Sequence, residues 1–162
     1  MRAEFINAFL KAAIEVLAGE TGLRVDRGSL TLRPSTLTTQ DVNSLVEISG
    51  ERIGGMVLVG MSSETALALV GKMLNQRMAE LDELTTSGIA ELTNVIASRA
   101  CGLLDSADYA CAITPAALIA GTGARVSTLA VQSVVVPLHL LLGTVELQVA
   151  LKERGSAVIA QT

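Results

Sequence analysis

Aromatic residues are almost absent from this sequence of 162 residues, which has two phenylalanines, one tyrosine and no tryptophan. Half of the residues are nevertheless hydrophobic and 17% are charged, a balance that excludes a disordered chain. The core must therefore be built from Leu, Val, Ile and Ala. Phe5, Phe9 and Tyr109 are also too few to form a surface on which nucleic-acid bases stack.

Positive charge is scarce as well. The chain has 12 Lys and Arg residues against 16 Asp and Glu residues, a net charge of −4, and no cluster of basic residues. Nucleic acid is a poor partner for such a chain, because neutralisation of phosphates dominates nucleic-acid binding.

A long hydrophobic run is also missing. The longest one, Val134–Leu142, contains Pro137 and His139 and is too short to span a bilayer. Glu4 and Lys11 interrupt the first apolar stretch, so the N-terminus does not have the pattern of a signal peptide. We therefore expect a soluble, cytoplasmic protein that has no membrane partner.

Side chains that bind transition metals are few. Cys101 and Cys111 do not have the spacing of a metal site, and the chain has a single histidine, His139, to assist them. We interpret both cysteines as buried or partly buried thiols in a reducing cytosol and expect no metal to be bound by this chain.

The first half of the chain predicts a helix, extended segments, a hairpin and a short helix. The expected elements are a helix over Arg2–Ala18 ended by Gly19 and Gly22, extended structure over Leu23–Arg33 with a turn at Asp26–Ser29, antiparallel strands over Val42–Ser49 and Ile53–Met61, and a helix over Thr65–Leu74 capped by Ser62 or Ser63. A Thr-rich connection at Ser35–Gln40 precedes the hairpin.

The end of the chain predicts strands. The expected elements are Cys111–Thr114 and Leu118–Ala120 separated by Pro115, a long extended segment over Arg125–Leu141, a last strand over Thr144–Leu151 with Glu146, Gln148 and Lys152 facing outward, and a frayed tail from Gly155 to Thr162. We predict one domain over residues 1–162, of the α+β class. It would be a largely antiparallel sheet with two long helices and one short helix on a face.

The longest helical pattern lies between these halves, at Glu80–Asp105. At about 100° per residue, an apolar stripe centred on Leu92 runs along it. The other residues of the stripe are Leu81, Leu84, Gly88, Ile89, Val95, Ile96, Ala100 and Leu103. Arg99 falls near the middle of this stripe, so its charge must reach solvent, an ion-pair partner or an interface.

Four polar residues gather on the flank of the opposite face of this helix. They are Ser87, Glu91, Asn94 and Ser98. This places a carboxylate and a carboxamide one turn apart among small neighbours, a surface suited to entering the cleft of another molecule. The tetrapeptide E-x-x-N alone specifies nothing, because Glu4 and Asn7 repeat it and most polar helix faces are merely solvated.

Five segments in order resemble the CheX/CheC/FliY family of chemotaxis phosphatases, and within it the CheX members. They are EFINAFLKAAIEVL, IGGMVLVGMSSETALALVGKML, the S-x-x-x-E-x-x-N pattern of Ser87, Glu91 and Asn94, ITPAALIAG, and LLGTVELQVALKE. Two departures are visible. Ser98 stands where members often carry Gly, and ITPA lacks the second proline often found there.

The resemblance implies an enzyme that removes phosphate from the aspartyl-phosphate of a CheY-like receiver domain. It assigns Asn94 to orienting the attacking water and Glu91 to pairing with a lysine of the receiver, with Ser87 and Ser98 in contact with the partner. The receiver would supply the Mg²⁺. Because the chain has one convincing copy of the motif, the resemblance to CheX also implies a homodimer with two sites.

Two other hypotheses stay open from the sequence. The first is a non-catalytic adaptor that binds a receiver domain or a flagellar switch protein through the same helix face. The second is a metal- or thiol-dependent enzyme built from Cys101, Cys111 and His139, although no spacing supports it.

Overall fold

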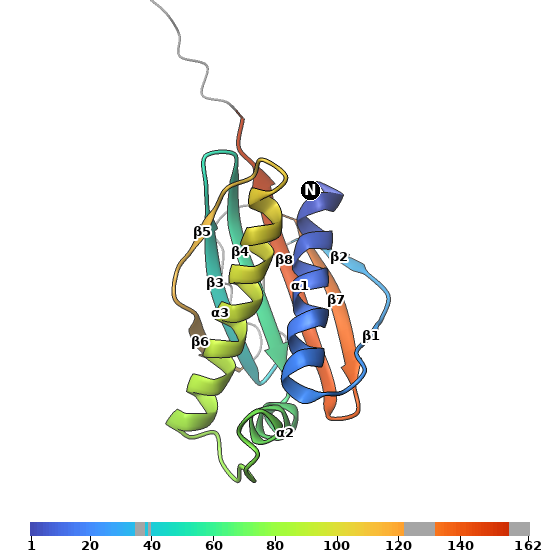
Figure 1. The fold of residues 1–162 in the computed structure, drawn as a ribbon, viewed down its shortest axis with the longest axis vertical. Coiled ribbons are helices and arrows are strands. Elements are labelled where there is room, and N and C mark those ends of the chain that lie inside the picture. Colours follow the sequence, from blue (N-terminus) through green and yellow to red (C-terminus); the bar gives the residue numbers. More distant parts are fainter. Residues whose placement is uncertain (35–37, 39, 122–131, 156–162) are drawn as a thin grey trace, which may run out of the picture.

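The computed structural model describes residues 1–34, 38, 40–121 and 132–155. Three helices and eight strands make up this part of the chain (Figure 1). The helices are α1 (Ala3–Thr21), α2 (Ser63–Leu74) and α3 (Glu83–Asp105). The strands are β1 (Asp26–Arg27), β2 (Thr31–Arg33), β3 (Val42–Ser49), β4 (Ile53–Met61), β5 (Ala112–Ile113), β6 (Ala117–Ala120), β7 (Ser133–Leu140) and β8 (Gly143–Glu153).

The strands form a single antiparallel sheet in the order β1-β7-β8-β4-β3-β5, in which β2 also pairs with β7 and β6 with β3. The predicted hairpin is confirmed, with Val42 opposite Met61 and Ser49 opposite Gly54. The break predicted at Pro115 is also confirmed, because β5 and β6 are separate short strands along the same edge of β3. The chain thus has the expected α+β architecture.

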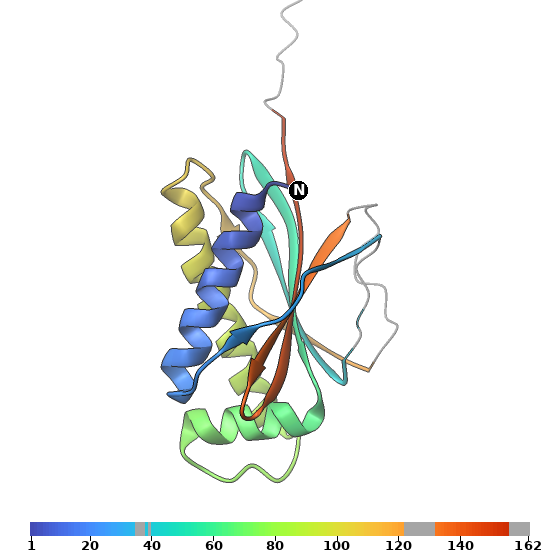
Figure 2. The same cartoon turned by 90° about the vertical axis from the view of Figure 1, so that its right-hand side faces the viewer.

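The two long helices lie side by side on one face of the sheet, and α2 crosses their lower end (Figures 1 and 2). Their apolar faces and the facing side of the sheet enclose a continuous aliphatic core, as the composition predicts. Arg99 stays exposed and pairs with Glu15 of α1, with Nη1 and Oε2 3.4 Å apart. Of the three predicted possibilities, the guanidinium of Arg99 thus both reaches solvent and forms an ion pair, between α3 and α1.

Both long helices differ from the sequence prediction at an end. Helix α1 continues through Gly19 and ends at Thr21, where Gly22 takes a left-handed conformation with φ of 67°. Gly22 is therefore the residue that ends the helix, because glycine adopts this conformation without a steric cost. Helix α3 begins at Glu83 and not at Glu80, since Asp82 caps it.

The buried face of α3 is rotated relative to the predicted stripe. Ile89, Leu92, Ile96 and Ala100 are buried as expected. Leu84 and Val95 are 50% and 36% exposed, however, and Leu81 precedes the helix. Thr85, Thr93, Ala97, Cys101 and Leu104 are buried in addition. A prediction based on hydrophobic residues alone placed the buried face wrongly, because small and hydroxyl-bearing residues fill much of this interface. Thr93 can be buried there because its hydroxyl donates to the carbonyl of Ile89.

Strand β8 also corrects one expectation. Gln148 does not face solvent: its side chain is 2% exposed, and Nε2 donates to Oγ of Ser133 over 3.0 Å. The face of the sheet away from the helices is therefore not simply solvated, which alternation of residue types along one strand does not reveal.

The N-terminus of α1 is fastened to the far end of the sheet by an aromatic and ionic cluster. The rings of Phe5 and Tyr109 meet edge to face, with centroids 4.9 Å apart. The hydroxyl of Tyr109 donates to Glu153 at the end of β8, and Arg2 donates to the same carboxylate. These bonds lower the pKa of Glu153, led by the one from Tyr109. Arg52 lies over the tyrosine ring, 4.6 Å from its centroid.

Several expected segments fall wholly or partly outside the described residues. They are the connection at Ser35–Gln40, the first part of the extended segment predicted over Arg125–Leu141, and the tail after Gly155. In the described part of the chain, no helix is long and apolar enough to cross a membrane.

Candidate active site on helix α3

The four polar residues predicted to form a surface lie together on α3. Ser87, Glu91 and Ser98 are exposed and Asn94 is half-buried. At about 100° per residue, the four lie within roughly 60° of one another around the helix. The surface therefore combines one carboxylate with one carboxamide, flanked by two serines whose small side chains leave the helix accessible.

Asn94 differs from its neighbours because part of its side chain is engaged within the molecule. Its Oδ1 accepts a hydrogen bond from the backbone N–H of Ala116, over 3.0 Å. Ala116 follows Pro115 in the connection between β5 and β6. Asn94 therefore lies at the junction between the helix and the edge of the sheet, whereas the side chain of Glu91 is exposed on the helix surface.

Small residues and capping bonds hold the N-terminal half of α3 in place. A Cβ atom added to Gly88 would meet Val70 of α2 at 2.9 Å, so this glycine permits close contact of the two helices. The side chain of Asp82 accepts from both the N–H and the hydroxyl of Thr85. The polar surface thus sits on a helix whose start and orientation are fixed one turn before Ser87.

The cap at Asp82 predicts a pH dependence of stability. Hydrogen bonds from Thr85 lower the pKa of Asp82, the largest cause being the bond from its backbone N–H. A lowered pKa in the folded state means that this contribution to stability is present above the unfolded-state pKa and is lost as pH falls through the folded-state pKa. We expect Asp82→Asn to remove this acid-side decline, measured as the urea midpoint against pH. An unchanged pH profile in the variant would show that other carboxylates dominate.

The structure brings the two cysteines together but leaves the histidine elsewhere. Sγ of Cys101 on α3 and Sγ of Cys111 before β5 are 2.8 Å apart. Burial raises the pKa of both thiols, so neither is an activated thiolate near neutral pH. His139 lies on β7, on the other side of β8, β4 and β3, where its Nδ1 contacts Oγ1 of Thr144.

The metal- or thiol-dependent enzyme is therefore not supported, because its three residues do not form one site. Over residues 1–34, 38, 40–121 and 132–155, no group of three or more His, Cys, Asp and Glu side chains could hold a metal ion.

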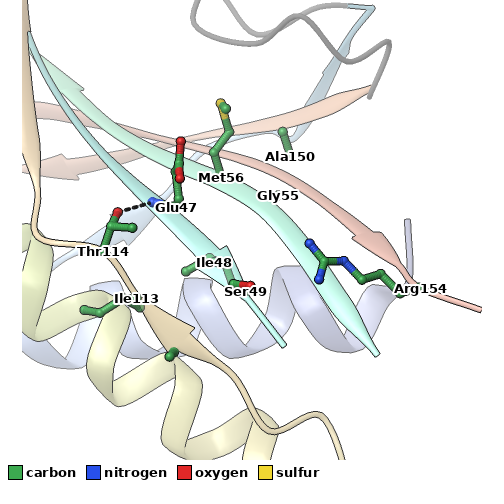
Figure 3. A pocket seen from close by; sticks show the side chains of 10 residues that line it. Glu47, Ile48, Ser49, Gly55, Met56, Ile113, Thr114, Ala150 and Arg154 are labelled. Atoms are coloured by element: carbon green, nitrogen blue, oxygen red, sulfur yellow. Dashed lines mark hydrogen bonds between the residues drawn. The ribbon is translucent and has the colours of Figure 1, made fainter. Parts of the chain in front are cut away.

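A pocket of about 410 Å³ opens on the face of the sheet away from the helices (Figure 3). Glu47, Met56 and Ala150 line it from three neighbouring strands, with Arg154 at its end (Figure 3). The side chain of Thr114 is bonded to β3 at this pocket, since its Oγ1 accepts from the backbone N–H of Glu47. One isolated carboxylate and one guanidinium do not make a catalytic group, so the surface on α3 is the better candidate.

The fold is that of the CheC-like proteins. A CheC-like superfamily protein from Shewanella sp. PV-4 matches with a TM-score of 0.84 and 24% identity, over 94% of this chain and 99% of that one. One chain of the crystal structure of a CheX–CheY–BeF3–Mg²⁺ complex from Borrelia burgdorferi also matches. Its TM-score is 0.81 at 24% identity, over 94% of this chain and all of that one.

The sequence narrows this class further. The model of the family described as chemotaxis phosphatase CheX matches residues 42–139. The CheY-P phosphatase CheX of Thermotoga maritima is 30% identical over 135 residues, which cover 81% of this chain and 84% of that protein. This chain belongs to the CheX family of chemotaxis phosphatases, which confirms the resemblance drawn from the sequence.

Sequence reasoning missed one part of the site, the contact of Asn94 with the sheet edge. Pro115 predicted a break between two strands but not what the break would contact. Ala116 takes part only through its backbone N–H. A search of the sequence for functional side chains could therefore not find it.

Proposed function

We propose that this chain hydrolyses the aspartyl-phosphate of a CheY-like receiver domain by placing Ser87, Glu91, Asn94 and Ser98 of α3 at the receiver's active site. The supporting observation is that these residues share one accessible side of a firmly packed helix. The Borrelia relative was solved in a complex whose components are CheX, CheY, BeF3 and Mg²⁺. That complex supports a receiver of this kind as the partner.

The chemistry requires little from this chain beyond position and charge. A water molecule forms a new bond to phosphorus while the bond from phosphorus to the aspartate oxygen breaks, releasing inorganic phosphate and a free carboxylate. Phosphoryl transfer of this kind depends mainly on alignment of the attacking oxygen and on electrostatic stabilisation. Asn94 would orient the water, and the receiver would supply Mg²⁺ along with the phosphorylated residue.

Glu91 is the charged contact of the proposal. Its carboxylate is exposed on α3 and would pair with a lysine of the receiver. We expect Glu91→Ala to raise the KM for the phosphorylated receiver by roughly fivefold or more, because a charge pair closed off from water at an interface contributes more than an exposed one. Glu4→Ala, the equivalent change in the other E-x-x-N sequence, is the matched control. Equal effects of the two variants would argue against a specific role for Glu91.

The decisive experiment measures the decay of a phosphorylated receiver with increasing, substoichiometric amounts of this chain. A phosphatase increases the decay rate in proportion to its concentration and releases more than one phosphate per chain. An adaptor binds the receiver and leaves its decay unchanged. The second outcome would replace the proposed hydrolysis with simple binding through the same surface.

Assembly and location form a separate part of the proposal. We propose a cytoplasmic homodimer with two sites. The supporting observation is at a sheet edge, where Leu30 and Leu32 beside and within β2 are 42% and 59% exposed. Apolar residues on an edge strand favour association unless they are covered. The molar mass in solution decides between monomer and dimer.

A further inference from the structure

The hydrogen bond between Asn94 and Ala116 determines which end of the carboxamide faces outward. A backbone N–H can only donate, so the atom 3.0 Å from it must be the carbonyl oxygen Oδ1. The usual ambiguity between the oxygen and the nitrogen of an amide is thereby removed. Among the described residues, Nδ2 has no hydrogen-bond partner, and it is not a buried unsatisfied atom. Solvent therefore reaches the NH2 end.

The donor that holds Oδ1 is rigidly placed. Thr114, two residues earlier, is bonded twice to Glu47 of β3: its N–H donates to the carbonyl of Glu47 over 3.1 Å, and its Oγ1 accepts from the N–H of Glu47. After Ala116, β6 begins at once and pairs Ala117 with Leu45. Pro115 restricts the backbone between these anchors. The connection is thus fixed to β3 on both sides of the N–H.

We infer that the backbone N–H of Ala116 is a positioning group that makes Asn94 a hydrogen-bond donor to the phosphoryl site. The inference rests on the proposed function and deepens it. With Oδ1 turned toward Ala116 and bonded there through one lone pair, the outward NH2 end of Asn94 presents two N–H donors. Nδ2 donates to one lone pair of the attacking water or to a phosphoryl oxygen, and it does not accept the proton of the water.

This bond requires a residue with a backbone N–H at position 116, where this chain has alanine. A proline at position 116 would have no N–H and could not hold Oδ1. Without the bond, the carboxamide would be free to rotate and present either end. The N–H of Ala116 therefore holds the Asn94 carboxamide in one of its two possible orientations.

Two variants test the role in turnover. Ala116→Pro removes the N–H, and Ala116→Ser retains it as the matched control. We expect Ala116→Pro to lower kcat by roughly fivefold, the effect of one hydrogen bond that orients the reacting group, with the KM for the phosphorylated receiver unchanged. Ala116→Ser is expected to keep the wild-type kcat. A higher kcat in Ala116→Pro would overturn the inference, because it would mean that the bond withholds an acceptor that the reaction needs.

A measurement on the wild-type fold does not depend on tolerance of the proline. Amide hydrogen exchange of Ala116 is compared between the wild type and Asn94→Ala, free and bound to the beryllofluoride-activated receiver. We expect exchange in the variant to be faster by about tenfold or more in both states, because the bond persists in the complex. Loss of this difference in the complex would show that the bond opens on binding and would refute a donor role.

These outcomes are distinguishable from a failure of the proposed function. If the wild type does not accelerate receiver decay at all, hydrolysis itself is wrong. If it does, and Ala116→Pro turns over at the wild-type rate, hydrolysis stands and the positioning role of Ala116 is wrong.

Discussion

Replacing Asn94 with alanine is expected to slow removal of phosphate from the receiver by at least about tenfold, which corresponds to about 1.4 kcal/mol of transition-state stabilisation. The reason is that Asn94 provides the amide group next to the reacting phosphoryl group in the proposed complex. The loss should appear in kcat, because Glu91 and the serines, which are exposed, would still provide the binding contacts of the proposed complex. The fold should persist, since Asn94 is not part of the apolar core.

The matched control for this variant is Asn7→Ala. Asn7 is the asparagine of the second E-x-x-N sequence, and it is exposed on α1. Equal turnover of Asn7→Ala and the wild type, beside a slow Asn94→Ala, would assign the reaction to α3. If Asn94→Ala accelerates decay as much as the wild type does, the chain uses another group for hydrolysis. If neither protein accelerates decay while both bind the receiver, the chain acts only as an adaptor.

Replacing Phe5 with alanine is expected to lower the free energy of unfolding by about 3–5 kcal/mol, the usual cost of removing a buried phenylalanine ring. Phe5 is fully buried, and its ring meets Tyr109 edge to face. Its loss leaves a cavity between the start of α1 and the residues that follow α3. Urea denaturation of both proteins measures the effect.

Phe5→Leu is the control for this change, because leucine retains much of the buried volume and should lose less than half as much stability. Turnover per folded molecule should stay at the wild-type value, since Asn94 is held by Ala116 and not by this cluster. A loss of turnover in fully folded Phe5→Ala would mean that the cluster and the site are coupled through α3.

The sequence predicted the fold closely where local signals and burial agree. The hairpin of β3 and β4 has its predicted bounds, because alternating side chains and a short turn determine both strands and register. The buried face of α3 was less predictable. Hydroxyl and small residues such as Thr85 and Ala97 pack there, and a scale of hydrophobicity does not identify them.

The candidate site was predictable in its helical half only. Ser87, Glu91 and Asn94 are close in sequence, so the period of the helix alone places them together. The contact of Asn94 with Ala116 joins residues 22 positions apart through the pairing of β5 and β6 with β3. Such a contact depends on the tertiary arrangement, which local patterns do not contain.

This protein has very little intrinsic fluorescence, because the only fluorescent side chain of the sequence other than phenylalanine is the tyrosine of the aromatic cluster. The chain has no tryptophan, and its single tyrosine is Tyr109, which is buried against Phe5. Light at the red edge of the absorption spectrum would excite the tryptophans of a partner and nothing in this chain. Binding to an unlabelled receiver that has a tryptophan near its phosphorylation site can therefore be followed directly, with every change in signal arising in the receiver.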